Sequence, residues 1–527
     1  MKREDLIAPD QYNIVMEMES HAENPEKLAL IWENEDGQHI EVTYSELMKQ
    51  ANRIGNVLSQ HGLTKGDKLL VMMPRLIETY EVYIAALKLG IIIIPSSEML
   101  RKQDLLYRIE HGEVNGIVSF YEYVDQFEGI SEGLIKFTAG KEVAGWHHLD
   151  PLKEEASDVL EMVPTSRDDI AFLPYTSGTT GNPKAVMHTH AWGYAHMRTA
   201  PVNWLSIKEH DLVWATAAPG WQKWVWSPFL SVLGSGATGF VYHGKFSPNR
   251  YLQLLDEKKI NVFCCTPTEY RLMAKVDNLA DYHLSHLHSA VSAGEPLNKE
   301  VIDQFEHHFG ITVRDGYGQT ENTLLLGFLK GMKVKPGSMG KPTPGNNVTI
   351  IDEQGKPVGP NIVGDIAVPL DTPALFKGYY KEKERTLKTY RGDYYVTGDQ
   401  AYMDEEGYFW FHGRRDDIII SSGYTIGPFE VEDALIKHPK VKECAVVPSP
   451  DPIRGNVVKA FVVLKNEEDQ HDNELVKELQ NHVKKLTAPY KYPRKIEFID
   501  ELPKTSSGKI RRIELRELEK KRVQNSK

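Results

Sequence analysis

The stretch Tyr175-Thr-Ser-Gly-Thr-Thr-Gly-Asn-Pro-Lys184 places four small hydroxyl side chains and two glycines between an apolar run, residues 170–173, and a Pro-Lys pair. Because glycine has no Cβ, successive backbone N–H groups can close around an anion. The hydroxyls add further donors, and Lys184 adds a positive charge. The stretch therefore predicts a phosphate-binding loop that follows a strand. A polar surface turn is the simpler alternative, since turns also favour Gly, Ser and Pro.

Two other glycine-rich stretches imitate nucleotide-binding motifs. Residues 239–245 match a Walker A motif until Phe246, which stands where a Ser or Thr would have to hold Mg²⁺. Residues 234–239 fit GxGxxG, but a helix-like segment precedes them and a strand-like run follows. A dinucleotide fingerprint needs the opposite order, strand first and helix second. We therefore expect no nicotinamide or flavin site in this region.

Length and charge narrow the class of protein. A chain of 527 residues exceeds one ordinary core, so two or three domains are expected. The 62 basic and 74 acidic residues give a net charge of −12, which disfavours binding to nucleic acid or to an anionic membrane. No apolar run is long enough to span a bilayer, and the charged N-terminus lacks the apolar core of a signal peptide. We expect a cytoplasmic protein.

Cysteine and histidine give little support for a disulfide framework or a metal site bound by side chains. Cys264, Cys265 and Cys444 form neither a disulfide framework nor a CxxC pair, and they fit a reducing compartment. His188 and His190 are the tightest histidine pair, without a third ligand at suggestive spacing. We interpret both as core or surface histidines.

The order of helix-like and strand-like segments predicts the architecture. Such segments alternate over residues 28–170 and again over 205–315, a pattern typical of α/β layers with parallel sheets. Residues 337–411 instead show short strand-like runs and Gly/Pro turns, which predict a β-rich subdomain. After Gly413 comes a compact segment with one amphipathic helix and two strands, which predicts a small α+β domain.

Five further motifs accompany the phosphate loop. Together with residues 176–184, and in this order, they resemble the adenylate-forming superfamily of acyl-CoA synthetases, luciferases and peptide-synthetase adenylation domains. The resemblance extends over about residues 28–515. Any one motif could arise by chance, but the ordered set is specific. The motifs are Ala293-Gly-Glu-Pro-Leu297, Asp315-Gly-Tyr-Gly-Gln-Thr-Glu321, Tyr395-Val-Thr-Gly-Asp399, Gly413-Arg-Arg-Asp-Asp417 and Leu502-Pro-Lys-Thr-Ser-Ser-Gly-Lys509.

This resemblance implies a reaction in two halves. A carboxylate attacks the α-phosphorus of ATP to give acyl-AMP and pyrophosphate, and CoA then accepts the acyl group. Because both first reactants are anions, catalysis consists of positioning and charge neutralisation. The implied partners are ATP, CoA and a carboxylic acid, with Mg²⁺ as the ion; the resemblance also allows a homodimer. It implies an N-terminal AMP- and acyl-binding domain, residues 1–413, a hinge, residues 414–417, and a mobile C-terminal domain, residues 418–527.

The resemblance also assigns roles to residues. Glu321 matches the Mg²⁺-binding glutamate, and Asp399 matches the carboxylate that accepts both ribose hydroxyls. Arg414 would assist at the ribose and phosphates, and Lys509 matches the lysine that bridges the α-phosphate and the incoming carboxylate. Thr176 joins Lys509 and Glu321 as a candidate catalytic residue. The candidate ATP- and AMP-binding residues are Thr176, Ser177, Gly178, Thr179, Thr180, Gly181, Lys184, Gly294, Glu295, Pro296, Asp315, Gly316, Tyr317, Gly318, Gln319, Thr320, Asp399, Arg414 and Lys509.

Candidates for the second half reaction lie after the hinge residue, which the resemblance places at Asp416. Ser422 and Gly423 resemble the segment that lines the pantetheine tunnel, and Arg454 is the candidate for holding the CoA phosphates. The chain departs from the family at Thr425, where the acyl-CoA branch commonly carries an arginine. The lost charge bears on CoA affinity or rate.

The acyl pocket is expected to be open. Acetate-specific members carry a Trp where this chain has Gly318, and each methylene buried in the freed space contributes about 0.8 kcal/mol. Trp221 is the candidate pocket wall, whereas Trp224 and Trp226 fit a pocket wall or ordinary core packing equally well. The motifs resemble those of medium-chain and branched-chain acyl-CoA synthetases most closely, so acids of roughly four to ten carbons are expected. Gly318→Trp should then favour acetate.

Three alternatives stay open from the sequence. An adenylating enzyme could load a carrier protein in trans instead of free CoA. A luciferase-like oxygenase lacks positive support in the residues. A non-catalytic acyl-AMP or nucleotide sensor would have no use for Glu321 and Lys509 together.

Overall fold

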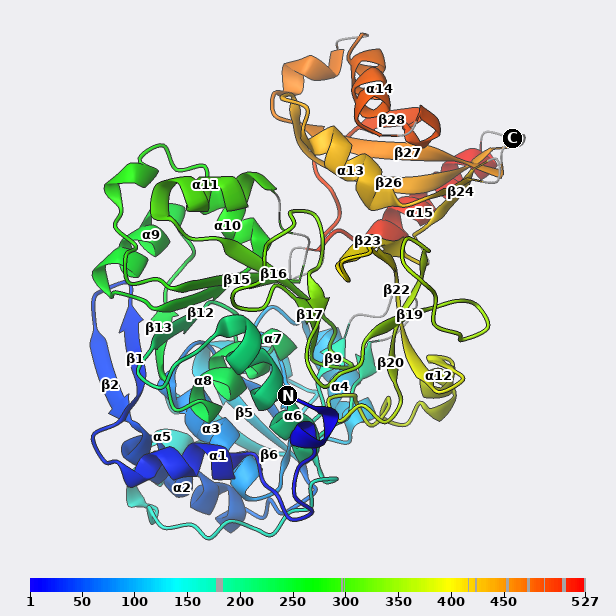
Figure 1. Cartoon of the computed structure of the whole chain (residues 1–527). Helices are drawn as coiled ribbons and strands as arrows, with labels where there is room; N and C mark the ends of the chain where they lie inside the picture. Colours follow the sequence, from blue (N-terminus) through cyan, green and yellow to red (C-terminus); the bar gives the residue numbers. More distant parts are fainter. Residues whose placement is uncertain are drawn as a thin grey trace. The chain divides into compact units, whose positions relative to one another are not determined.

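The computed structural model divides into two compact units, residues 1–349 with 368–395 and residues 350–367 with 396–527 (Figure 1). Each unit has a hydrophobic core of its own. Several predicted site residues lie outside the described part of the chain: Ser177, Gly178, Thr179, Thr180, Gly181, Glu295, Pro296, Asp416, Ser422, Gly423 and Arg454. The structure describes residues 1–176, 183–294, 297, 299–415, 417–421, 424–451, 455–471, 474–487, 489–504 and 509–525.

A nine-stranded sheet forms one layer of the first unit, with the order β18-β17-β16-β15-β14-β12-β13-β1-β2. From β16 to β1 neighbouring strands are parallel, and β2, β17 and β18 are antiparallel additions at the edges. The strand-like segments predicted within residues 205–315 are confirmed as β12 to β15, which are parallel neighbours in this sheet. The strands are β1 (Leu28–Asn34), β2 (His39–Thr43), β12 (Leu212–Ala215), β13 (Thr238–His243), β14 (Val262–Cys265), β15 (Ser289–Ala293), β16 (Val313–Gly318), β17 (Leu324–Gly327) and β18 (Lys341–Pro342).

A seven-stranded sheet forms the second layer, with the order β11-β8-β4-β3-β5-β6-β7. It is parallel from β8 to β7, and only β11 runs antiparallel. The short aliphatic runs of β3 and β4 are buried, as strands covered on both faces require. The strands are β3 (Lys68–Met72), β4 (Ile92–Pro95), β5 (Gly116–Phe120), β6 (Ile135–Ala139), β7 (His147–His148), β8 (Ile170–Phe172) and β11 (His188–Thr189).

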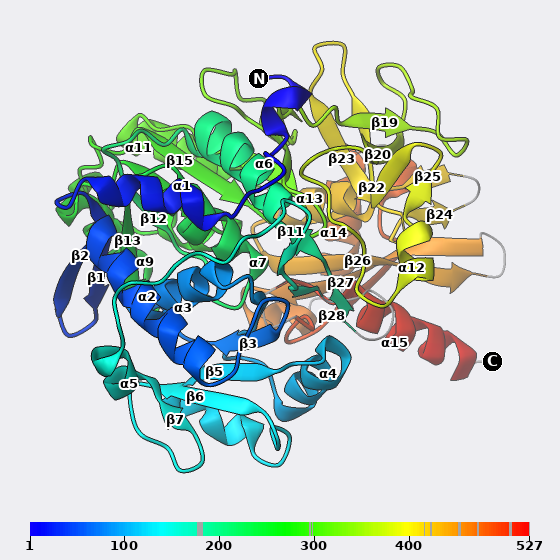
Figure 2. The ribbon, with the colours of Figure 1, turned by 90° about the horizontal axis from the view of Figure 1, so that it is seen from below.

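The largest core of this unit joins both sheets to the helices α2 (Tyr44–Gln60), α3 (Ile77–Lys88) and α6 (His190–Ala200) and to the π-helical segment η5 (Val225–Ser231). Almost every residue of α3 is buried, because it packs on several sides. Thr43 accepts from the N–H of Glu46 and so caps the N-terminus of α2. The other face of the nine-stranded sheet is covered by α9 (Pro248–Glu257), α10 (Pro267–Met273) and α11 (Lys299–Phe309) (Figure 1). α4 (Lys102–Gly112) packs on the seven-stranded sheet, beside β5 (Figure 2).

The second unit contains the predicted small α+β domain. The strands β26 (Val441–Asp451), β27 (Gly455–Leu464) and β28 (Lys495–Phe498) form one sheet. Alternate residues of β26 face opposite sides: Cys444 and Val446 pack with α13 (Pro428–Ile436) and α14 (Leu475–Leu486), whereas Ala445 and Val447 pack with α15 (Arg512–Asn525). This period of two is typical of a strand buried on both faces.

The predicted β-rich region is a five-stranded sheet with the order β19-β20-β22-β21 and with β23 beside β22. The division between the two units cuts the strands β20 and β22 of this sheet and groups residues 350–367 and 396–413 with the C-terminal segment. A hinge at residues 414–417 stays a prediction. The strands are β19 (Thr349–Ile351), β20 (Gly364–Pro369), β21 (Tyr390–Arg391), β22 (Tyr394–Met403) and β23 (Phe409–Arg414).

The remaining described elements are short. Among the described helices, none has both the length and the apolar composition needed to cross a membrane. The short elements are α1 (Val15–Glu19), α5 (Leu149–Glu155), α7 (Gln222–Trp224), α8 (Val232–Gly234), α12 (Lys383–Leu387), β9 (Tyr175–Thr176), β10 (Lys184–Ala185), β24 (Ile419–Ser421), β25 (Tyr424–Ile426), and the 3₁₀ or π turns Arg3–Leu6, Ser20–Glu23, Tyr121–Phe127, Pro201–Leu205, Leu279–Asp281, Glu467–His471 and Pro489–Lys491.

Candidate active site

The predicted phosphate loop is bracketed by a two-stranded ribbon. β9 and β10 pair antiparallel, with Thr176 directly opposite Lys184. The residues between them, 177–182, lie outside the described part, so their predicted donor role stays a prediction. The ribbon nevertheless brings the two ends of the loop together and sets the half-buried Lys184 beside it. A lysine at this place can neutralise an anion held by the loop.

Glu321 meets Lys184 in a three-membered hydrogen-bonded group. Oε1 of Glu321 accepts from the hydroxyl of Tyr379 at 2.7 Å and from Nζ of Lys184 at 3.3 Å. Nζ of Lys184 also donates to the hydroxyl oxygen of Tyr379 at 2.9 Å. Glu321 is only 7% exposed and Tyr379 only 3%. The carboxylate is therefore held by one cation and one phenol. Sequence reasoning missed Tyr379, because it lies about sixty residues beyond Glu321 and belongs to none of the six motifs.

Main-chain hydrogen bonds hold the same three segments together. The N–H of Phe376 donates to the carbonyl oxygen of Glu321 at 2.8 Å. The N–H of Tyr380 donates to the carbonyl oxygen of Ala185, and the N–H of Met187 donates to that of Gly378. Gly378 has a φ of 131°, a conformation that favours glycine. Residues 184–187, the Glu321 turn and residues 376–380 thus form one hydrogen-bonded arrangement.

A column of stacked rings supports the other side of the Glu321 turn. His188 stacks on Trp192 with ring centroids 4.0 Å apart, and Trp192 stacks on His196 at 5.4 Å. The spacing of four residues sets the three rings on one face of the β11–α6 segment. Nε2 of His188 donates to the oxygen of Thr320 at 2.6 Å, and Nε1 of Trp192 donates to the oxygen of Asn322 at 2.9 Å. The two carbonyls that flank Glu321 are therefore both satisfied by this column.

The tautomer of His196 follows from its neighbours. Nε2 of His196 lies 3.0 Å from the carbonyl oxygen of Trp226, which can only accept, so this nitrogen carries the hydrogen. Nδ1 then accepts from the hydroxyl of Thr323 at 2.7 Å. Burial lowers the pKa of His188 and of His196 to about 3, so both rings are neutral at physiological pH. His188 and His190 serve packing, as expected, since Nδ1 of His190 accepts from the N–H of Ile14.

Asp315 and Gly316 are the last residues of β16 that pair with the parallel strand β15, where the resemblance places the adenine pocket. The Asp315 carboxylate accepts from the N–H of Gly316 at 2.8 Å and from that of Leu297 at 3.2 Å. Burial raises the pKa of Asp315 to about 7, while these N–H groups and the charge of Lys223 lower it. A Cβ on Gly316 would lie 2.7 Å from the Trp204 ring, so the strand can approach that indole only with glycine at this position.

The turn that follows is closed by side chains. The N–H of Gln319 donates to Oδ1 of Asn322 at 2.8 Å, and the N–H of Asn322 donates back to the oxygen of Gln319. The hydroxyl of Tyr395, from the predicted 395–399 motif, donates to Oε1 of Gln319 at 3.1 Å. Two of the predicted motifs are therefore in contact. Gly294, in a third motif, has a φ of 109°, which favours glycine.

The expectation of empty room beside Gly318 needs correction. A Cβ at this position would lie 2.2 Å from the main-chain oxygen of Thr323 and 2.9 Å from Cη2 of Trp226. The backbone of the neighbouring turn and a different indole already occupy this space. Trp224 is core, packed against Tyr83 among other aromatic rings. Trp221, the candidate pocket wall, is the N-cap residue that precedes α7 and is partly exposed.

Lys223 is a second residue that sequence reasoning missed. Its Nζ lies 4.7 Å from the ring centroid of Trp204 and 5.8 Å from that of Trp226. Both distances are within the range of a cation–π contact. Trp204 packs on Gly316 and Trp226 packs on Gly318. The Lys223 ammonium therefore lies next to the two indoles that contact residues 315–318 of β16. The periodicity of α7 and η5 gave no signal for a charged residue in this aromatic cluster.

In the second unit, Asp399 and Arg414 are cross-strand partners on β22 and β23. Nε of Arg414 lies 3.4 Å from Oδ1 of Asp399, so the predicted ribose carboxylate is paired with the predicted ribose arginine. Asp399 is buried, whereas Lys509 is exposed. Lys504 and Ile510 pair antiparallel at the two ends of the stretch that leads to Lys509.

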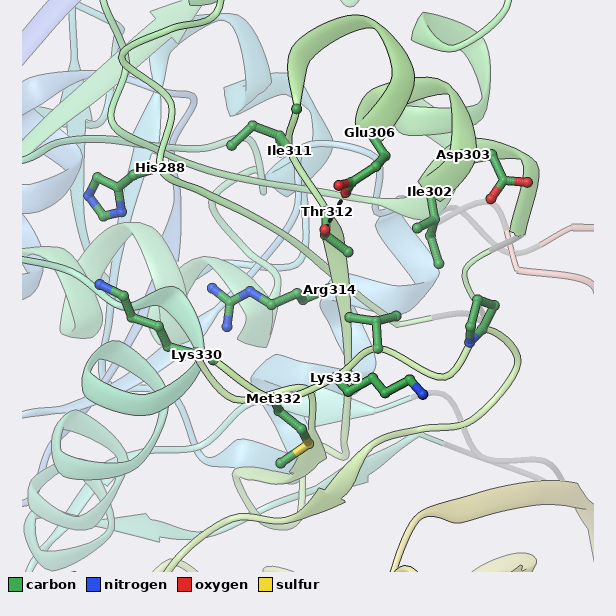
Figure 3. A pocket seen from close by; sticks show the side chains of 14 residues that line it. His288, Ile302, Asp303, Glu306, Ile311, Thr312, Arg314, Lys330, Met332 and Lys333 are labelled. Carbon is green, nitrogen blue, oxygen red and sulfur yellow. Dashed lines mark hydrogen bonds between the residues drawn. The ribbon is translucent and has the colours of Figure 1, made fainter.

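One surface hollow of the first unit lies apart from these residues. It has a volume of about 650 Å³ and is lined by His288, Glu306, Arg314 and Lys330 among others (Figure 3). His288 precedes β15 and Arg314 follows the first residue of β16, so the hollow lies at the amino ends of these strands. The residues Gly294 and Asp315–Gly318 lie at the carboxyl ends, where α/β sheets bind their ligands. The hollow is therefore not part of the candidate site.

The residues around Glu321 fit a magnesium ion that is held mainly by nucleotide phosphates. Among the described residues, no three or more His, Cys, Asp or Glu side chains gather to form a metal cluster. Mg²⁺ is commonly bound by one or two carboxylates together with substrate phosphates and water. A single buried carboxylate beside the phosphate loop fits this pattern.

Comparison with known proteins agrees with this geometry. The family model of the AMP-binding enzymes matches residues 18–380, and that of the AMP-binding enzyme C-terminal domain matches residues 430–509. The chain belongs to the AMP-binding enzyme family. It lies in the acyl-CoA synthetase branch of the adenylate-forming superfamily, as the motifs predicted.

Relatives of this AMP-binding enzyme span its whole length. It is 62% identical to the "uncharacterized acyl–CoA ligase YtcI" of Bacillus subtilis (strain 168), over all of both chains. It is 42% identical to the mitochondrial acyl-coenzyme A synthetase ACSM3 of Pongo abelii, covering 98% of this chain and 91% of the relative. The solved structure of the anthranilate CoA ligase AuaEII with anthranoyl-AMP superposes with a TM-score of 0.89 at 29% identity, covering 99% and 100%. The predicted α/β fold is thereby confirmed.

Proposed function

We propose that this acyl-CoA ligase activates medium-chain or branched-chain carboxylic acids through an acyl-AMP intermediate. The observation that carries the adenylation step is the group of Lys184, Glu321 and Tyr379 at the base of the phosphate loop. It combines a mobile cation for phosphate with a buried carboxylate for a hard metal ion. A nucleotide sensor would need neither a metal carboxylate nor the exposed Lys509.

The proposed reaction proceeds in two half reactions. A carboxylate oxygen of the acid attacks the α-phosphorus of ATP, and the bond to the β-phosphate oxygen breaks to release pyrophosphate. The CoA thiol then attacks the acyl carbonyl, AMP leaves, and the thiol proton passes to solvent. Lys184 would neutralise the phosphates, and Lys509 would neutralise the α-phosphate and the acid. Bound Mg²⁺ would supply charge neutralisation at the leaving pyrophosphate, with Glu321 as its protein ligand.

The assignment of the acid rests on sequence features at the predicted pocket. Residues 315–321 and the Ser-Pro-Asp-Pro-x-Arg-Gly segment at 449–455 resemble those of medium-chain and branched-chain synthetases. Trp221 is the candidate apolar wall, whereas Gly318 gives no support to the assignment because the space beside it is filled by the Thr323 main chain and Trp226. Aromatic acids are the competing class, because AuaEII is an anthranilate CoA ligase.

Free CoA is the proposed acceptor. The Arg454 segment resembles the surface on which CoA-using members hold nucleotide phosphates, and the curated relatives are named as CoA ligases or synthetases. The loss of an arginine at Thr425 would lower CoA affinity or rate. A carrier protein loaded in trans is the alternative acceptor.

The test is AMP release by the purified protein with Mg-ATP, over straight and branched acids from C2 to C12 together with benzoate and anthranilate, each with and without CoA. CoA-dependent turnover that peaks at medium or branched chains supports the proposal. A peak at acetate or at an aromatic acid would reject the proposed acid class and retain the ligase. Acyl-AMP formation without stimulation by CoA would indicate a carrier protein.

A further inference from the structure

The Lys184–Glu321–Tyr379 group contains one more cation than a metal carboxylate needs. Lys184 lies 3.3 Å from the carboxylate oxygen that also accepts the Tyr379 hydroxyl. The buried Glu321 requires a compensating positive charge, because an unpaired carboxylate in this position would be costly. Lys184 supplies that charge in the structure. The same lysine borders the predicted phosphate loop. It can therefore pair with either of two anions, the Glu321 carboxylate or the phosphates of a bound nucleotide.

The geometry points to a cation exchange at Glu321, which deepens the proposed function. Without nucleotide, Lys184 neutralises Glu321. With Mg-ATP bound, Glu321 would hold the metal ion and the released Lys184 ammonium would neutralise the phosphates. The site then never leaves the carboxylate or the triphosphate without a counter-charge. Tyr379 is a positioning residue in this exchange, because its hydroxyl holds Oε1 of Glu321 in both states.

The hydrogen bonds leave one carboxylate oxygen for the metal. Both donors, Tyr379 and Lys184, address Oε1, and none of the described residues donates to Oε2 of Glu321. Tyr379 cannot follow the lysine, since its backbone is tied to Thr386 Oγ1 at 2.9 Å and to residues 185–187 through its neighbours. The phenol is thus a fixed donor, whereas the lysine is the mobile member of the group.

The Tyr379 hydroxyl joins the two charged groups. It donates to Oε1 of Glu321 at 2.7 Å and accepts from Nζ of Lys184 at 2.9 Å. The Lys184 ammonium also lies 4.5 Å from the centroid of the Tyr379 ring, which guides it along the same side chain.

The exchange is tested by a double-mutant cycle on metal-free ATP binding, measured by calorimetry in EDTA without acid or CoA. In the wild type, metal-free ATP must break the Lys184–Glu321 pair to gain the ammonium. Glu321→Gln frees the lysine and should tighten metal-free ATP binding about tenfold. In a Lys184→Met background, the same substitution should change binding by less than about twofold.

An equal gain in both backgrounds would mean simple repulsion between Glu321 and the triphosphate, and would overturn the exchange. Because the experiment uses neither acid nor CoA, its failure leaves the proposed ligase function intact if AMP is still released in the turnover assay. Absence of metal-free ATP binding in all variants would overturn the exchange, and the turnover assay alone decides the ligase function.

The positioning role of Tyr379 has its own readout. Tyr379→Phe keeps the ring and removes the hydroxyl, so the Mg²⁺ concentration for half-maximal adenylation should rise about tenfold. Tyr380→Phe is the matched control, since the adjacent phenol donates to Glu113 and not to Glu321. The role is supported if the Mg²⁺ concentration for half-maximal adenylation rises in Tyr379→Phe alone, independently of any change in kcat. Equal behaviour of the two variants would refute it.

Discussion

Nε2 of His188 donates a hydrogen bond to the main-chain oxygen of Thr320 at 2.6 Å. The acceptor directly precedes Glu321, so an imidazole on the segment after the phosphate loop fixes the approach of the chain to the candidate metal carboxylate. The same ring stacks on Trp192, which holds the oxygen on the other side of Glu321. The main chain on both sides of Glu321 is thus held by the rings of His188 and Trp192, and its carboxylate is held by the hydroxyl of Tyr379.

His188→Phe should raise the Mg²⁺ requirement of the enzyme. The phenyl ring keeps the stack on Trp192 but leaves the partly buried Thr320 oxygen without its donor, at a cost of about 1–3 kcal/mol in unfolding free energy. His190→Phe is the control, because His190 is equally buried and its ring, among the described residues, is hydrogen-bonded to the distant Ile14 N–H and not to the Glu321 turn. Both variants should lower Tm, but only His188→Phe should change Mg²⁺ activation. A shared change in activation would mean general destabilisation.

The affinity for ATP should depend on pH through Asp315. Burial raises the pKa of this carboxyl to about 7, so it is protonated below pH 7 and ionised above. If the ionised form accepts the adenine amino group, KM for ATP should rise several-fold as the pH falls from 8 to 6. Asp315→Asn keeps an acceptor oxygen without a titration, and its KM should vary only as far as ATP itself titrates. An identical profile in both proteins would remove Asp315 from the adenine pocket.

A substitution of Lys223 provides a second test of the titration of Asp315. Its positive charge lowers the pKa of Asp315, so Lys223→Met should move the midpoint of the ATP profile to higher pH. The methionine keeps the length of the side chain over Trp204 and removes only the charge. A midpoint that stays in place would show that another group titrates.

Substitution of Gly318 should abolish activity rather than change the preferred acid. A Cβ would collide with the Thr323 oxygen and with Trp226, and relief requires a shift of the turn that carries Glu321. Gly318→Ala should therefore lower Tm and reduce turnover with every acid, and Gly318→Trp should do so more strongly. Gly359→Ala, where a Cβ meets nothing within 4 Å, is the control. A shift of Gly318→Trp toward acetate would restore the open-pocket interpretation.

The α/β layers of this fold could be predicted from the sequence, because buried parallel strands such as β12 and β14 are short apolar runs that are recognisable without knowledge of distant residues. It also indicated which motifs meet, as the bond between Tyr395 and Gln319 shows. It could not indicate Tyr379, whose role arises only from the pairing of residues 376–380 with residues 184–187. Nor could it reveal that Trp226 fills the space at Gly318, since that contact joins two elements about ninety residues apart.

Lys509→Ala should separate the two half reactions. Lys509 is exposed, so its removal should leave Tm nearly unchanged, while the loss of its charge at the α-phosphate should abolish acyl-AMP formation from acid and ATP. Thioester formation from supplied acyl-AMP and CoA should persist, because that step no longer places two anions together. Lys504→Ala is the control on the same stretch of chain. It loses an ion pair with Glu443 but should retain both activities. Quench-flow measurement of each half reaction decides the matter: loss of both steps in Lys509→Ala would contradict a role confined to adenylation, and retention of both would remove Lys509 from the site.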